Sequence, residues 1–227
     1  MRRVAALVRT TVGLKAGMAV SGLLFFGFVV GHMAGNLKSF QGADAFNHYA
    51  EGLRTIGAPI FGHGQLLWVA RIGLLVALVV HVVAAIVLTR RSRLARPVGY
   101  QKTPHLEDTY ASRTMRVGGV LLFVYVVYHL MHFTWGNAHP HFIRGDAYYN
   151  LVVGFQSPVV VGVYVAAQIL LAMHLYHGIW SALQTLGANH PAYDRWRRPA
   201  AALFSGIIFL GFTAVPLAVL TGVIGLS

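Results

Sequence analysis

Six histidines lie within long apolar segments and are the side chains best suited to chemistry in this chain. They are His32, His81, His129, His132, His174 and His177. A neutral imidazole buried in hydrocarbon needs a partner, because leaving it unpaired costs several kcal/mol. A single buried histidine is most simply a packing residue. Four separate segments that each supply at least one histidine indicate instead a cofactor site built from facing helices.

The depths of these histidines sort them into two levels, because successive membrane helices run in opposite directions. His32 lies near the outer end of the first segment, and the two histidines of the third segment lie in its outer half. His81 and the two histidines of the fourth segment lie in inner halves. At a rise of about 1.5 Å per residue the levels are on the order of 10 Å or more apart. Facing imidazole pairs suit six-coordinate haem b, and two such haems would carry electrons across a membrane.

Other uses of the histidines fit less well. Structural zinc needs four ligands at one point, whereas these histidines form separated pairs. A proton relay would need carboxylates in the apolar segments, but all six acidic residues lie between them. The chain has no cysteine, which excludes disulfides, iron–sulfur clusters and covalently attached haem within it. Between the two histidines of each His-x-x-His pair, depth alone slightly favours His132 and His177.

Composition predicts an all-α membrane protein, since 56% of the 227 residues are hydrophobic and only 11% are charged. Several apolar runs exceed the roughly 18 to 20 residues needed to cross a bilayer. We expect one transmembrane domain over residues 1–227, made of five helices. Their approximate ranges are 12–36, 65–89, 116–135, 158–185 and 200–223.

The net charge of +12 is best explained by topology rather than by nucleic-acid binding. Of the 18 lysines and arginines, fourteen lie in segments on one side of the predicted bundle, and only Lys38, Arg54 and Arg144 lie on the other. The positive-inside rule therefore places the N-terminus in the cytoplasm and the C-terminus outside, with the chain as a multi-pass protein of the cytoplasmic membrane. No small-residue cleavage site follows the first apolar run, so we expect it to be retained.

The connecting segments carry further expectations. Residues 44–56 and 146–155 have the pattern of short helices lying at the membrane surface, with ordinary surface loops as the alternative. The basic segment 90–116 could be a lipid-attracted loop or a docking surface for an acidic partner protein. Gly27, Gly31 and Gly35 share one helical face, which would let another helix or a flat cofactor held by His32 approach the backbone.

Four short motifs, in order along the chain, carry a resemblance to a known family. They are Gly31-His32-Met33, His81, Tyr128-His129-Leu130 and His174-x-x-x-Gly178-Ile179-Trp180. The chain resembles the di-haem cytochrome b membrane subunit of succinate:quinone oxidoreductases, the succinate dehydrogenases and fumarate reductases, in their five-helix class. The resemblance covers nearly the whole chain.

This resemblance implies that His32 and His129 ligate an outer haem b and that His81 and His174 ligate an inner one, which overrules the slight preference from depth. His132 and His177 would then pack or face a quinone or a propionate. Some similar proteins use a glutamate for proton transfer two residues before the fourth ligand. Ala172 stands there in this chain, so a path gated by glutamate is doubtful.

The resemblance also implies the partners and the reaction. A flavoprotein carrying FAD and an iron–sulfur subunit would dock on the basic cytoplasmic face. Electrons from succinate would reach the inner haem, then the outer haem, then a membrane quinone, usually menaquinone. The chain itself would carry electrons without catalysing succinate oxidation. The alternatives are a cytochrome b of a hydrogenase or formate dehydrogenase, and a non-haem transporter or structural anchor.

Two groups of residues near the outer haem are further candidates. Arg71, in the second apolar segment, needs a counter-charge, which a haem propionate could supply; the alternative is that it extends to the headgroups. A quinone site needs hydrogen-bond donors. Its outer candidates are Asn36, His48, Tyr49, Glu51 and His139, with Trp180 and Gln184 as inner alternatives.

Overall fold

The protein folds into a bundle of long helices in a computed structural model that describes residues 10–95, 110–188 and 190–226. The described residues form helices and no strands, and five of the helices are long and apolar enough to cross a membrane, as predicted. These five are α2 (Thr11–Leu37), α4 (Gln65–Leu94), α5 (Tyr110–Leu130), α7 (Pro158–Thr185) and α8 (Pro191–Leu220). Shorter elements are η1 (Lys38–Gln41), α3 (Ala43–Thr55), η2 (Met131–Trp135) and α6 (Ala147–Gly154).

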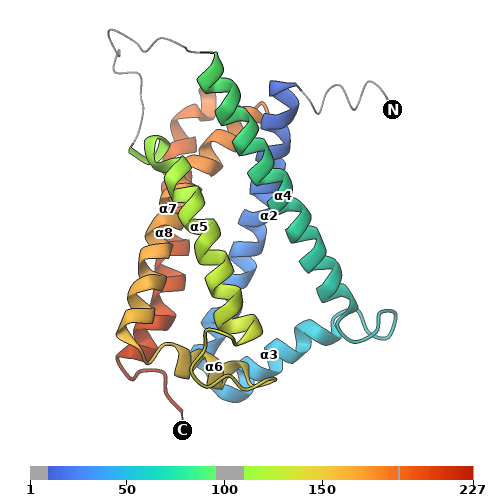
Figure 1. The fold of residues 1–227 in the computed structure, drawn as a ribbon, viewed down its shortest axis with the longest axis vertical. Coiled ribbons are helices and arrows are strands. Elements are labelled where there is room, and N and C mark those ends of the chain that lie inside the picture. The colour runs from blue at the N-terminus through green and yellow to red at the C-terminus, as the bar shows by residue number, and fades with distance from the viewer. Residues whose placement is uncertain (1–9, 96–109, 189, 227) are drawn as a thin grey trace.

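Helix α2 is central to the bundle, because it packs against α4, α7 and α8. Helices α7 and α8 pack along each other, and α5 packs mainly against α7. Helix α2 begins and α8 ends at opposite ends of the bundle (Figure 1), as an odd number of spans requires. The predicted bounds of the fourth span, α7, are those observed.

Two helices are longer than predicted because their polar ends stay helical. Helix α8 begins at Pro191 rather than near 200, since the His190 side chain caps it by accepting a hydrogen bond from the Ala192 amide (3.2 Å). Pro199 lies inside this helix without ending it. Helix α4 continues past 89 to Leu94, where the Arg91 guanidinium donates to the Thr11 hydroxyl (3.3 Å) and ties α4 to the start of α2.

The third span ends at Trp135 as predicted, but it begins earlier and changes its helix type near its end. Helix α5 begins at Tyr110, about six residues before the predicted start, and its α-helical part stops at Leu130. From Met131 to Trp135 the chain forms a π-helix, η2, which the sequence did not predict. A π turn holds more residues than an α turn, so side chains within it leave the α-helical register. This turn carries His132, which is fully buried.

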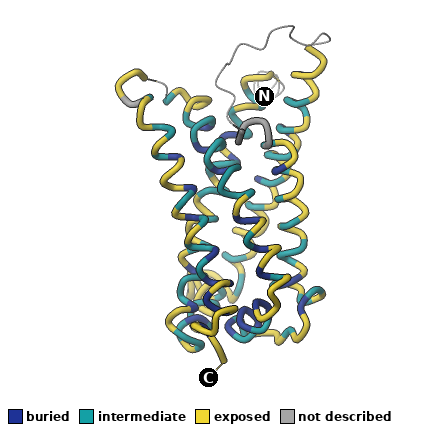
Figure 2. The backbone as a smooth tube through the Cα atoms, turned by 90° about the vertical axis from the view of Figure 1, so that its left-hand side faces the viewer, coloured by how far each residue is buried: buried dark blue, intermediate teal, exposed yellow. Residues whose placement is uncertain are grey.

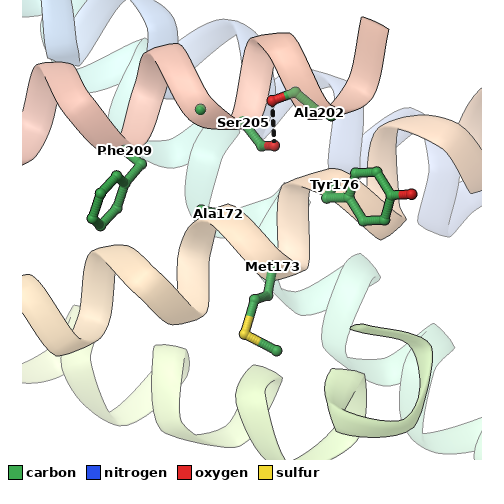
Figure 3. Close-up of a pocket in the computed structure, with 7 residues that line it drawn as sticks. Ala172, Met173, Tyr176, Ala202, Ser205 and Phe209 are labelled. Atoms are coloured by element: carbon green, nitrogen blue, oxygen red, sulfur yellow. Dashed lines mark hydrogen bonds between the residues drawn. The ribbon is translucent and has the colours of Figure 1, made fainter. Parts of the chain in front are cut away.

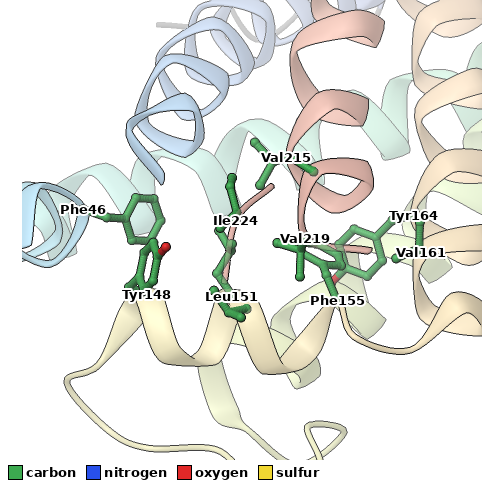
Figure 4. Close-up of a cluster of buried hydrophobic side chains, with 11 residues drawn as sticks. Phe46, Tyr148, Leu151, Phe155, Val161, Tyr164, Val215, Val219 and Ile224 are labelled. Carbon is green, nitrogen blue, oxygen red and sulfur yellow. The ribbon is translucent and has the colours of Figure 1, made fainter. Parts of the chain in front are cut away.

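Helices α3 and α6 lie across one end of the bundle (Figure 1), which confirms that residues 44–56 and 146–155 are largely helical. The side-chain nitrogen of Asn47 donates to the Asp146 carboxylate (3.0 Å), and the side-chain oxygen of Asn47 accepts from the backbone amide of Tyr148 (2.9 Å). We call this end the outer end, following the expected topology. A core of buried side chains fills it (Figure 4), comprising Phe46, Tyr148, Leu151, Val152, Phe155, Val161, Tyr164, Val215, Ala218, Val219 and Ile224.

The long helices are exposed over much of their length (Figure 2), and many of their exposed side chains are large and apolar. Leu75 and Val79 on α4 and Val120 and Val124 on α5 are each more than half exposed. Such faces suit contact with lipid tails. Most of the basic segment 90–116, including Lys102, lies outside the described residues, as do Arg2, Arg3 and Arg9.

Candidate cofactor site

The outer pair consists of His32 on α2 and His129 on α5, whose ring centroids are 5.9 Å apart with planes at 81°. Phe28 stacks on the His32 ring at 5.3 Å, and Phe212 of α8 lies 5.8 Å from it. The structure therefore brings together the two rings that the resemblance pairs at the outer level. Ligation of iron by them stays a prediction.

The inner pair consists of His81 on α4 and His174 on α7, with ring centroids 6.1 Å apart. The Nδ1 atom of His81 lies 3.2 Å from the Met18 carbonyl oxygen and 3.2 Å from the Ser21 hydroxyl. A carbonyl only accepts hydrogen bonds, so Nδ1 of His81 carries the proton. The lone pair is then on Nε2, which is the tautomer that a metal ligand needs.

The two pairs lie at different depths, and two helices measure their separation. Along α2, His32 is eleven residues from Ser21, which bonds the inner pair. Along α7, His174 is ten residues from Tyr164, which bonds the outer pair. At about 1.5 Å per residue these spacings are about 16 Å and about 15 Å, so the two measurements agree.

The spacing within each pair fits one metal atom held between two imidazoles. Metal–nitrogen bonds of about 2.0–2.1 Å, with about 1.2 Å from each nitrogen to its ring centre, put coaxial rings about 6.4 Å apart. The observed 5.9 and 6.1 Å are within half an ångström of that value. The buried Nδ1 of His174, the nitrogen that would not bind the metal, has no hydrogen-bond partner in the described part of the chain. Among the described residues no group of three or more His, Asp or Glu side chains is placed to hold a metal ion.

A hydrogen-bonded chain backs the outer pair. The Tyr164 hydroxyl of α7 lies 3.2 Å from Nδ1 of His129 and 2.9 Å from Nδ1 of His132. Tyr164 and His132 are both buried. A methyl group at Gly154 would lie 3.1 Å from Nε2 of His132, so the close approach of α6 to this ring requires glycine. His132 is therefore buried beside the outer pair and is not one of its two facing rings.

Gly27, Gly31 and Gly35 of α2, which were predicted to share one face, have two different surroundings. A side chain at Gly35 would collide with Tyr49, because a methyl group there would lie 2.7 Å from the tyrosine hydroxyl. The predicted close approach is real at this position, but a side chain of α3 makes it. At Gly27 and Gly31 a methyl group would meet no atom within 4 Å. That stretch of backbone, adjoining His32, is thus open to a bulky neighbour.

Arg71 and His139, two of the other residues predicted at the outer end, have protein partners. The Arg71 guanidinium lies over the Trp68 ring, 5.0 Å from its centroid, and the residue is exposed. Both ring nitrogens of His139 are engaged, by the Asn150 carbonyl (2.8 Å) and by the His141 amide (3.1 Å). Neither nitrogen is left to bind a quinone.

Glu51 is also engaged, through contacts to His63 (2.9 Å) and Arg54 (3.1 Å). The hydrogen bond from His63, followed by the effects of Arg54, lowers the pKa of Glu51 from its ordinary value of 4.5. This carboxylate therefore belongs to a surface ion-pair group on the outer side.

An apolar groove of about 310 Å³ runs between α7 and α8 (Figure 3). Ala172, Met173, Tyr176, Ala202, Ser205, Gly206 and Phe209 line it. The Ser205 hydroxyl is turned to its own helix, where it donates to the Ala202 carbonyl (3.1 Å). The position expected for a proton-transferring glutamate thus holds a methyl group in an apolar setting.

The family model of the succinate dehydrogenase/fumarate reductase transmembrane subunit matches residues 90–215, more than half of the chain. The chain belongs to this family. No curated protein and no solved structure matches it. This succinate dehydrogenase/fumarate reductase transmembrane subunit is thus a multi-pass membrane protein and a membrane anchor in an enzyme complex. The match includes His129 and His174, while His32 and His81 lie before it.

Sequence reasoning missed Ser21 and Tyr164, which hold the rings of this anchor subunit. A serine inside an apolar helix usually bonds its own backbone, and Ser21 does so, donating to the Gly17 carbonyl (2.8 Å). A tyrosine in a membrane helix is ordinary too. Only the packing of α2 on α4 and of α5 on α7 brings these hydroxyls to histidines.

Proposed function

We propose that this subunit binds two haem b groups and passes electrons between an iron–sulfur subunit and a membrane quinone. His32 and His129 would hold the outer haem, and His81 and His174 the inner one. The observation that carries the proposal is the pair of ring contacts, 5.9 and 6.1 Å between centroids, at two depths about 15 Å apart. When bound, haem b would supply a one-electron Fe(III)/Fe(II) couple at each depth.

The chain's own residues would prepare each site for that group. Met18 and Ser21 keep the proton of His81 on Nδ1 and so turn the Nε2 lone pair toward the inner site. The apolar surroundings, with Phe28 against His32, exclude water from the ligands. Open space beside Gly27 and Gly31 leaves room for a flat ring system along α2.

The orientation and partners complete the proposal. The basic ends of the helices would face the cytoplasm, where the iron–sulfur subunit and the FAD-carrying flavoprotein dock. Arg91 and Arg93 close α4 at this end, and Arg195, Arg197 and Arg198 lie in the first turns of α8. The quinone, menaquinone by the resemblance, would react at the outer level. The complex would sit in the cytoplasmic membrane and oxidise succinate or reduce fumarate.

The experiment is to purify the complex through a tag on this chain and to record a dithionite-reduced-minus-oxidised spectrum. We expect two haem b per chain, a co-purifying flavin, and haem reduction by succinate. A colourless complex would contradict haem binding while leaving the family intact. A coloured chain without a flavoprotein would instead favour a cytochrome b of another dehydrogenase.

A further inference from the structure

The Tyr164 hydroxyl faces two imidazole nitrogens but carries one proton. It lies 3.2 Å from Nδ1 of His129 and 2.9 Å from Nδ1 of His132. The phenol can donate to only one of them, so the other nitrogen must donate to the phenol oxygen. The two hydrogen bonds that join His129, Tyr164 and His132 can therefore be arranged in only two ways, which differ in the direction of donation.

Only one of these directions leaves His129 able to bind a metal. If Tyr164 donates to His132, His129 must carry its proton on Nδ1 and presents the Nε2 lone pair. If Tyr164 donates to His129, the His129 proton moves to Nε2 and blocks ligation. For His129 to bind a metal, His132 must therefore offer Nδ1 as an acceptor and hold its own proton on Nε2, a buried nitrogen that has no hydrogen-bond partner among the described residues.

The geometry points to Tyr164 and His132 as positioning residues that fix the tautomer and orientation of His129 for the outer haem. This inference rests on the proposed function. The inner site reaches the same result differently, because a backbone carbonyl, Met18 O, orients His81. A carbonyl oxygen can only accept a hydrogen bond, whereas a hydroxyl can either donate or accept one. The tautomer of the outer ligand thus depends on side chains, and that of the inner ligand mainly on backbone.

Packing against neighbouring aromatic rings holds the side chains of Tyr164 and His132 in place. Its ring packs edge-on against Phe155 (4.8 Å) and Tyr125 (5.2 Å), and the residue is buried. His132 is held by stacking against Tyr128 at 5.6 Å and His139 at 5.1 Å. Because packing holds both rings, the main change still open to this group is the direction in which the Tyr164 hydroxyl donates its proton.

The test is Tyr164→Phe in the full complex, followed by potentiometric titration of both haems and low-spin EPR. Removing the acceptor makes His129 a less basic ligand, so the outer haem should become easier to reduce. We expect about a tenfold change in its oxidised-to-reduced ratio at a fixed potential, about 59 mV, or a 10- to 100-fold loss of its affinity. The inner haem should not change. The matched control is Tyr128→Phe, which keeps the ring against His132 and should leave both haems as in the wild type.

A second pair of variants keeps the inference testable if Tyr164→Phe does not accumulate. His132→Asn retains an acceptor near the position of Nδ1 and should preserve the outer haem, whereas His132→Leu removes it and should shift or lose that haem alone. Equal behaviour of these two variants, or an unshifted outer haem in Tyr164→Phe, would overturn the inference. A wild-type complex without haem would refute the proposed function instead.

Discussion

Replacing His32 with alanine separates the two proposed haem sites most cleanly. The change removes one ring of the outer pair while leaving His129, Tyr164 and their hydrogen bond in place. The inner pair is about 16 Å away along α2, beyond the roughly 7–10 Å within which mutational effects usually couple. The haem content should therefore fall from two per chain to one, and the potential of the remaining haem should not move.

The loss of folding stability should be small enough to permit this measurement. Truncating His32 removes contacts with the Phe28 and Phe212 rings, and a typical substitution costs about 1 kcal/mol. Haem content would be measured as the pyridine haemochrome relative to protein, together with a redox titration. The matched control is His48→Ala on α3, an exposed histidine at the same end of the bundle, which should retain both haems. Loss of both haems, or of neither, from His32→Ala would refute the pairing.

Three further changes test individual contacts. Ser21→Ala removes one of two partners of His81 but keeps the Met18 carbonyl, so both haems should bind and only the inner potential should move, as a redox titration would reveal; an altered outer haem would count against the assignment. Gly35→Ala forces its methyl group against Tyr49 and should destabilise the fold by about 1–3 kcal/mol, measured by denaturation in detergent, whereas unchanged stability would contradict the packing. Glu51→Gln should weaken the fall in folding stability as the pH is lowered below about 4.5. Because its folded pKa is lowered, Glu51 stabilises the fold above 4.5 and loses that contribution as the pH falls through the lowered pKa. Identical acid limbs in thermal melts of the two proteins would refute that explanation.

The helices could be predicted because apolar length and charge placement act locally. The apolar run of α7 begins at a proline, which fixes the helix start at residue 158. The start of α8 was missed because Pro199 and its basic neighbours look like a loop, while the capping by His190 depends on side-chain geometry. The π turn at Met131–Trp135 has no local signature, since its residues would form an ordinary α-helix equally well.

The four paired histidines could be chosen in advance, but the groups that hold them could not. Depth alone slightly favoured His132 over His129, and only the fold shows that His132 is buried against Tyr164 and Gly154, apart from the facing rings. Sequence also marked His139 as a quinone candidate, although the Asn150 carbonyl and the His141 amide occupy its nitrogens. These contacts join residues from different elements, so no spacing along the chain reports them.

The most direct test of the account is an experimental structure of the purified membrane complex that locates the iron atoms. We predict two irons about 15 Å apart in depth, one between Nε2 of His32 and His129, the other between Nε2 of His81 and His174. A single iron, two irons at one depth, or ligation by His132 or His177 would contradict it.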